Sequence, residues 1–232
     1  MGINQSSDSK ILLNVKYPVK IGNVFKLSIA EERANSLSHG VMAGLMLLAL
    51  PACAVFGYQK SGVALSIGYS VFIIGLFQMF LTSSLYHSMP FGTRYKSVFR
   101  TLDHSSIYIA IAGTFTPICL TDFAGRLGKF VLICQWLVAV LGIVMNFLSK
   151  KTKTKASVGI YLIMGWSAIL LVPGIIQNKL WGFLIFIILG GLLYSIGVIF
   201  YSKKSKAWFH FIWHLFIIGA SICHFIAIIF YI

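Results

Sequence analysis

Charge is scarce in this sequence, and negative charge is scarcer still. Only 10% of the 232 residues are charged, whereas a soluble domain carries about a quarter, so an ordinary soluble fold is excluded. Five Asp or Glu residues stand against nineteen Lys or Arg. The four cysteines show no CxxC spacing, which argues against a disulfide framework or a thiolate metal site. No Walker loop, GxGxxG fingerprint or G-x-S-x-G elbow is present, so nothing points to nucleotide binding or a serine hydrolase.

Long apolar runs are what the chain does have. Hydrophobic residues make up 58% of it, and the mean hydropathy is +0.89. A transmembrane helix needs about 20 apolar residues, and seven such runs are separated by short connections. The sequence therefore predicts an all-α, polytopic membrane protein: a seven-helix transmembrane domain over 36–232, preceded by a basic segment, 1–35. The predicted spans are 37–57, 63–86, 101–121, 127–148, 157–175, 180–201 and 208–231.

The basic residues predict an orientation for these spans. With seven spans, fifteen Lys or Arg fall on the side of the N-terminus and four on the other side. Cytoplasmic loops carry the excess of Lys and Arg, so we expect the N-terminus in the cytoplasm and the C-terminus outside. Because the basic residues lie between apolar runs, they favour an anionic membrane surface as their partner, and we expect no nucleic-acid binding.

Histidines gather at one predicted depth. His210 and His214 are four residues apart, so they share one helix face. In the predicted topology His87 ends its span on the same, cytoplasmic side. Three imidazoles at one depth favour a metal site, because ionisable groups are costly in a bilayer. Ser83 and Asp103 lie close enough in this scheme to orient an imidazole or a water. The ligand types favour Zn²⁺ and leave iron, nickel and copper open.

Three separated motifs give the chain a resemblance to a known family. They are "ERANSLSH", "SSLYH" followed by "LDHSSIYIAIAGTF", and "HFIWH". In this order the chain resembles the haemolysin III family, the bacterial branch of a superfamily with the progestin and adiponectin receptors and, more distantly, the alkaline ceramidases. The resemblance implies a seven-helix bundle with zinc near the cytoplasmic side. It implies the ligands His87, His210 and His214, with Asp103 and Ser83 beside the attacking water.

The first motif has a different expected role. The resemblance places Glu32, Asn35 and His39 in the family signature without making them ligands. They form one helical stripe, so we interpret them as residues that pack or cap helices. The chain lacks the long N-terminal domain of the receptors, and for that reason we expect no protein hormone as partner.

These observations lead to a functional hypothesis with two alternatives. The site is expected to act as a zinc-dependent hydrolase on an amide or ester of an amphiphilic membrane lipid, such as an acyl amide, in a ceramidase-like reaction. One alternative is a non-enzymatic sensor or regulator of membrane fluidity or energetics, with structural zinc. The other is a pore-forming, haemolytic protein. The Ile-, Lys- and Phe-rich composition and short loops suggest a bacterial plasma membrane.

Overall fold

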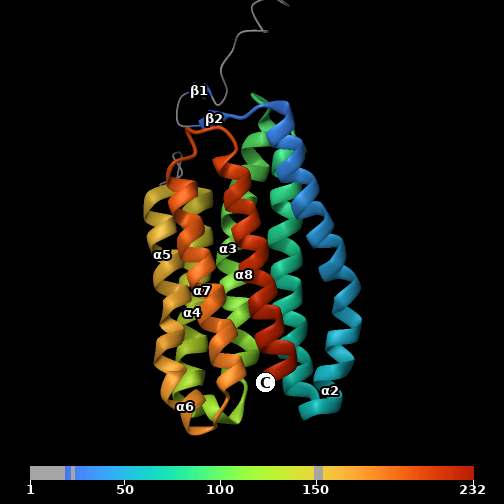
Figure 1. The fold of residues 1–232 in the computed structure, drawn as a ribbon, viewed down its shortest axis with the longest axis vertical. Helices are drawn as coiled ribbons and strands as arrows, with labels where there is room; N and C mark the ends of the chain where they lie inside the picture. The colour runs from blue at the N-terminus through green and yellow to red at the C-terminus, as the bar shows by residue number, and fades with distance from the viewer. Residues whose placement is uncertain (1–18, 22–23, 149–153) are drawn as a thin grey trace, which may run out of the picture.

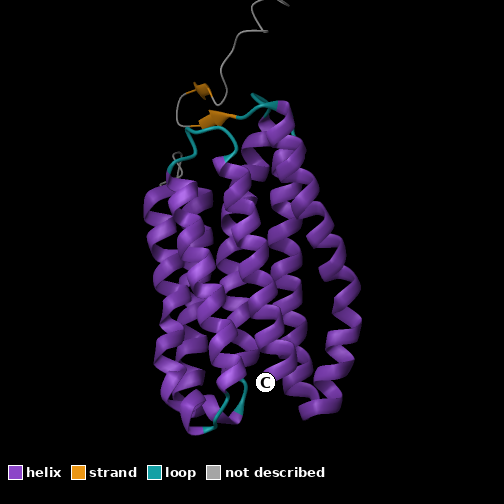
Figure 2. Ribbon diagram, in the orientation of Figure 1, coloured by secondary structure: helices purple, strands orange, loops and turns teal. Residues whose placement is uncertain are grey.

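Almost all of the described chain is helical. The computed structural model describes residues 19–21, 24–148 and 154–232, and its helices run side by side as one elongated bundle (Figures 1 and 2). A short antiparallel hairpin, β1–β2, lies across one end of the bundle, which we call the hairpin end. The elements are β1 (Val19–Ile21), β2 (Val24–Lys26), α2 (Ile29–Ser88), α3 (Arg94–Cys119), η2 (Asp122–Ala124), α4 (Gly125–Leu148), α5 (Thr154–Trp166), η3 (Ser167–Leu171), α6 (Val172–Gln177), α7 (Trp181–Ser202) and α8 (Phe209–Tyr231).

Helix α2 is two antiparallel helices joined by a sharp break. Ser61 has φ −152° and ψ 27°, and Gly62 has φ 73° and ψ −159°, so neither is helical. The positive φ of Gly62 is sterically unfavourable for residues that have a Cβ atom. Glycine has none, so it adopts this conformation without that cost. The two halves lie next to each other in Figure 1, and the chain turns between them at the end opposite the hairpin. The break falls in the predicted gap between spans 37–57 and 63–86.

Two helices begin earlier than the apolar runs indicated. The Ser28 side chain accepts a hydrogen bond from the backbone N–H of Glu31 and caps α2, which starts at Ile29. The Thr93 side chain accepts one from the N–H of Lys96, and α3 starts at Arg94. Hydropathy detects only the apolar part of a helix. A side-chain cap stabilises a helix start in polar sequence, before the apolar run begins. Of the predicted basic segment 1–35, residues 1–18, 22 and 23 lie outside the described residues.

The bundle is held by close contacts between helices. The second half of α2 packs along α3, and α7 packs along α8. At Gly113 on α3, an added Cβ would lie only 3.1 Å from the backbone oxygen of Val71 on α2, so the two backbones approach in the way that small residues allow in membrane helices. The Tyr69 hydroxyl donates to the backbone oxygens of Ile228 at 3.0 Å and Ile232 at 2.8 Å, which ties α2 to the end of α8.

The outer surface of the bundle is apolar. Large side chains such as Leu48 and Leu148 are 76% and 79% exposed. In the described part of the chain, five helices are long and apolar enough to cross a membrane, and α2 counts as one of them despite its break. A bundle with an apolar exterior and several such helices is a multi-pass membrane protein, because lipid is the solvent that suits this surface. The expectation of an all-helical membrane fold is therefore confirmed.

Candidate metal site

Three imidazole rings converge at the hairpin end of the bundle. His87 comes from the last turn of α2, and His210 and His214 come from the first turns of α8. The Nε2 atom of His210 lies 3.3 Å from Nε2 of His87 and 3.3 Å from Nε2 of His214. All three candidate ligand atoms lie within 4.8 Å of one another. The structure therefore brings together the three histidines that the sequence proposed as ligands.

The spacing of these nitrogens suits a metal ion. Zn–N bonds of about 2.05 Å in tetrahedral geometry put two ligand nitrogens about 3.3 Å apart, which is the separation of two of the three pairs. His87 and His214 are 4% and 2% exposed. Three neutral imidazoles aiming lone pairs at one point would repel each other, and a cation or shared protons would relieve this repulsion. The triad can thus bind a metal, and its donors do not by themselves identify which one.

A carboxylate contacts the first of these candidate ligands. Glu32 Oε2 lies 2.6 Å from Nδ1 of His87, and Glu32 Oε1 accepts from Lys96 Nζ at 2.9 Å. A proton held on Nδ1 by the carboxylate leaves Nε2 as the lone-pair nitrogen facing the other two histidines, as in carboxylate–histidine–metal arrangements. The sequence interpretation gave Glu32 a packing or capping role, whereas the structure places it against a candidate ligand. The cap of α2 is Ser28.

The other two members of the first motif lie beside the triad without entering it. His39 is 1% exposed, and its ring stacks on that of His214 with centroids 3.9 Å apart and planes at 24°. Asn35 is fully buried one turn earlier on the same helix. The candidate ligand group consists of His87, His210 and His214 and does not include His39. His39 therefore supports the ring of His214 by stacking against it. Packing remains the interpretation for these two residues.

The predicted water-orienting residues line a cavity next to the triad. Asp103 and Ser83 both face this cavity, as do the three histidines. The Asp103 carboxylate lies 3.4 Å from Nδ1 of His104, the next residue on α3. An oxygen acceptor and a hydroxyl therefore line the same cavity as the triad.

The cavity has a volume of about 440 Å³ and extends from the triad towards the far end of the bundle. Its lining on α3 runs from Arg100 to Ile118, about 27 Å at 1.5 Å per residue. Helices α2, α5, α7 and α8 and the η3–α6 segment supply the other walls, and most of the side chains are apolar. A volume of a few hundred Å³ with few polar groups is typical of a site for a small organic ligand. Its length and apolar walls fit an extended alkyl chain.

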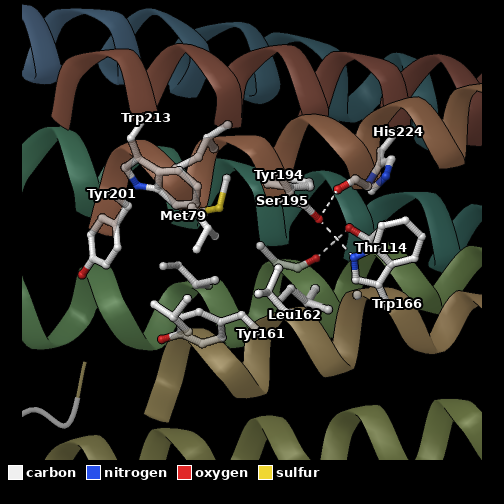
Figure 3. A pocket seen from close by; sticks show the side chains of 18 of the residues that line it. Met79, Thr114, Tyr161, Leu162, Trp166, Tyr194, Ser195, Tyr201, Trp213 and His224 are labelled. Atoms are coloured by element: carbon white, nitrogen blue, oxygen red, sulfur yellow. Dashed lines mark hydrogen bonds between the residues drawn. The ribbon is translucent and has the colours of Figure 1, made fainter. Parts of the chain in front are cut away.

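Polar side chains recur partway along the cavity. Figure 3 shows Tyr201 and Trp213 towards one side of the view and Trp166, Ser195 and His224 towards the other. The Trp166 indole N–H donates to Ser195 Oγ at 3.0 Å, which joins α5 to α7. The wall is therefore not purely apolar here, and one direct hydrogen bond across it joins two helices.

A contact between distant parts of the chain fixes the start of α8. The Glu31 carboxylate is 1% exposed and accepts hydrogen bonds from the Ser28 hydroxyl and from the backbone N–H of Trp208. Trp208 has φ 65°, a left-handed conformation that is uncommon for a tryptophan. It stands two residues before His210, so this carboxylate helps to set where the ligand helix begins. Sequence reasoning missed Glu31, because an acid in the first turn of a helix ordinarily indicates no more than a favourable dipole interaction.

The comparisons with known proteins agree over most of the chain. The profile of the family described as Haemolysin-III related matches residues 27–225. Hemolysin-3 of Bacillus cereus is 33% identical over 204 residues, which cover 88% of this chain and 93% of that protein. The Hemolysin-3 homolog of Bacillus subtilis (strain 168) is 34% identical over 204 residues, covering 88% and 95%. The monocyte to macrophage differentiation factor of Homo sapiens is 29% identical over 212 residues, covering 88% and 85%.

These matches span the triad, the cavity and nearly all of the helices. They confirm the family indicated by the three sequence motifs, and the membrane character of the bundle agrees with them. The chain belongs to the haemolysin III family of multi-pass membrane proteins.

Proposed function

We propose that this protein is a zinc-dependent hydrolase that cleaves an amide or ester of an amphiphilic membrane lipid. The observation that carries the proposal is the position of the triad at one end of a long, mainly apolar cavity. An alkyl chain in the cavity would bring the first polar bond of its lipid to the three histidines. Burial of the alkyl chain against the apolar walls would supply binding energy. The polar end of the lipid would then be held beside the triad, Asp103 and Ser83.

Zinc is the proposed metal because three neutral imidazoles suit it and leave a coordination position open for a reacting molecule. When bound, it would supply a Lewis acid and would lower the pKa of a coordinated water towards about 7. The protein's part is to hold His87 as the correct tautomer through Glu32 and to hold His214 against the ring of His39. Both contacts limit ring rotation, so the three nitrogens keep their separation.

The residues beside the triad have separate roles in this proposal. Asp103 would accept the proton of the attacking water and later return it to the leaving group, which is general base and then general acid catalysis. Ser83 would donate a hydrogen bond to the same water or to the substrate carbonyl. Both face the cavity next to the triad, and the ring nitrogen of His104 supports the carboxylate of Asp103 from the side.

We also propose the membrane arrangement that the sequence predicted. The two halves of α2, α3, α4, the α5–α6 segment, α7 and α8 would each cross the bilayer, which makes seven spans. The hairpin end would face the cytoplasm, because most of the basic residues would then lie on that side. In this arrangement the triad lies near the cytoplasmic face of a bacterial plasma membrane, and the C-terminus lies outside.

Metal content and turnover test the proposal together. The full chain, purified in a neutral detergent and supplied with zinc, is expected to bind about one Zn²⁺. His214→Ala is expected to lose it, and His224→Ala, which removes a histidine further along the same helix, is expected to keep it. The zinc-loaded protein should then release fatty acid from acyl amides or esters, and Asp103→Asn should abolish release while keeping zinc. Zinc binding without cleavage of any acyl lipid in a broad panel would refute the hydrolase.

One alternative is favoured by a specific observation, the name hemolysin-3 carried by two relatives. A protein that permeabilises membranes should conduct ions or release dye from liposomes, and a hydrolase that forms no continuous pore should not. A regulator with structural zinc would instead show four protein ligands, because structural sites usually close their coordination. X-ray absorption at the zinc edge counts the imidazoles and separates this arrangement from an open site.

A further inference from the structure

Two cationic side chains face the mouth of the cavity at the hairpin end. Arg100 lies on α3, one turn before Asp103, and Lys204 lies in the connection between α7 and α8. Both line the cavity together with the triad. The Lys204 ammonium sits over the ring of Tyr201, 4.5 Å from its centroid. Tyr201 in turn lies 6.1 Å, ring to ring, from His210. The positive charge of Lys204 is therefore held close to the triad.

Their inward position distinguishes these two residues from their basic neighbours. Arg94 on α3 and Lys203 in the same connection are exposed and do not line the cavity. A general excess of basic residues at a cytoplasmic face accounts for such outward side chains. It does not account for Arg100 and Lys204, which are only half-exposed and turn towards the cavity.

Holding two like charges at this mouth carries an energetic cost. Burial, and then the nearby guanidinium of Arg100, lower the pKa of Lys204 to about 8. Among the described residues that line the cavity, Asp103 is the sole carboxylate, and it already lies beside His104. Among these lining residues, two cationic side chains, Arg100 and Lys204, therefore stand against one carboxylate. An anionic group would offset this excess.

We propose that the mouth of the cavity binds the anionic headgroup of a single-chain amphiphile, with Arg100 and Lys204 as its cationic contacts. The guanidinium can take two oxygens of one phosphate or carboxylate, and the ammonium adds a point charge. The alkyl chain would lie along the apolar walls. This inference rests on the proposed function for the place of the chain, and it adds the headgroup class: an acidic amphiphile is bound in preference to a neutral one.

Binding of non-hydrolysable probes tests the inference without turnover. We would use the full chain in neutral detergent, stripped of metal with a chelator, so that neither cleavage nor metal–phosphate contact contributes. The probes share one alkyl chain and differ in headgroup: an alkyl phosphate, a fatty carboxylate, a zwitterionic alkylphosphocholine and a neutral alkyl glycerol ether. The acidic probes are expected to bind at least about tenfold more tightly than the neutral ether, since charge-assisted hydrogen bonds distinguish them.

Matched variants assign this preference to the two residues. Lys204→Gln and Arg100→Gln should each weaken binding of the alkyl phosphate by about tenfold or more, with little change for the ether. The controls Lys203→Gln and Arg94→Gln should stay within about twofold. Arg100→Lys keeps the charge and loses the two-oxygen contact of the guanidinium, so it should weaken binding less than Arg100→Gln does. If Arg100→Gln does not fold, this partial loss in Arg100→Lys, set against Arg94→Lys, is the measurement. Tighter binding of the phosphate than of the carboxylate would identify a phosphate headgroup, and tighter binding of the carboxylate would identify a fatty acid; equal binding would show that the site recognises the negative charge alone.

The result that overturns the inference is simple to recognise. Equal affinity for the neutral ether and the alkyl phosphate, or equal effects of Lys204→Gln and Lys203→Gln, would show that the mouth does not select acidic headgroups. Failure of the proposed hydrolase gives a different pattern: acidic probes would still be preferred and no lipid would be cleaved. Cleavage of neutral lipids alone, unaffected by Lys204→Gln, would keep the hydrolase and refute the headgroup inference.

Discussion

Replacing Glu32 by glutamine is the sharpest perturbation of the metal site. The carboxylate of Glu32 meets two donors, Nδ1 of His87 at 2.6 Å and Nζ of Lys96 at 2.9 Å. A glutamine amide has one acceptor oxygen and one NH₂ donor, so one of the two donors must face another donor. Loss of a contact that orients a ligand commonly weakens metal binding by roughly 10- to 100-fold, about 1.4 to 2.7 kcal/mol. We therefore expect Glu32→Gln to bind zinc more weakly by this factor.

The assay is competition for zinc against a chelator of known affinity, in detergent and at fixed pH. Stability needs a separate control, because the Lys96 side chain is only 7% exposed and would lose its partner. Leaving a buried charge without its partner costs about 3 to 5 kcal/mol. The double variant Glu32→Gln/Lys96→Met removes that charge, and it should recover the unfolding temperature without recovering zinc affinity. Wild-type zinc affinity in Glu32→Gln would refute the role of this carboxylate in orienting His87.

Two further predictions concern the cavity mouth and the bundle. Lys204, whose pKa burial and Arg100 lower to about 8, is charged below that pH; affinity for an alkyl phosphate should therefore fall as pH rises from 7 to 9, and Lys204→Gln should flatten this dependence. The other charged or titratable side chains that line the cavity are Arg100, Asp103, Tyr86, Tyr161, Tyr194, Tyr201, His39, His87, His104, His210, His214 and His224. Gly113→Val should destabilise the bundle by about 1 to 3 kcal/mol, because its Cβ would lie 3.1 Å from the Val71 oxygen. Gly44→Val, where a Cβ meets nothing within 4 Å, is the control, and a similar loss of thermal stability in both variants would contradict this packing argument.

The helices were largely predictable from the sequence, but their ends were not. Apolar runs located the break at Ser61 and Gly62, because the run itself is interrupted there. They missed the starts of α2 and α3, since Ser28 and Thr93 begin these helices in polar sequence through side-chain hydrogen bonds. The 3₁₀ segment η3, Ser167–Leu171, had no signal either, because a change from α to 3₁₀ geometry alters no hydrophobic pattern.

The histidine triad was predictable for a different reason. Helical spacing puts His210 and His214 on one face, and the alternation of spans brings His87 to the same end. Neither helical spacing nor the alternation of spans predicts which side chains on different helices contact each other. Glu32 reaches His87 across 55 residues of sequence, and the direction in which Lys204 points depends on the path of a short connection. Such contacts become visible only when the helices are placed in three dimensions.

The origin of the three candidate ligands has a consequence for the order in which the molecule is assembled. His87 and His210 are separated by 123 residues, so the α2–α3 pair alone holds a single member of the triad. A metal bound by one imidazole is held weakly, and strong binding has to wait until α8 docks on α2. The free energy of metal binding would therefore stabilise the state in which α8 has docked on α2. Metal would stabilise the completed bundle and leave partly assembled chains unaffected, so metal supply would favour the finished fold.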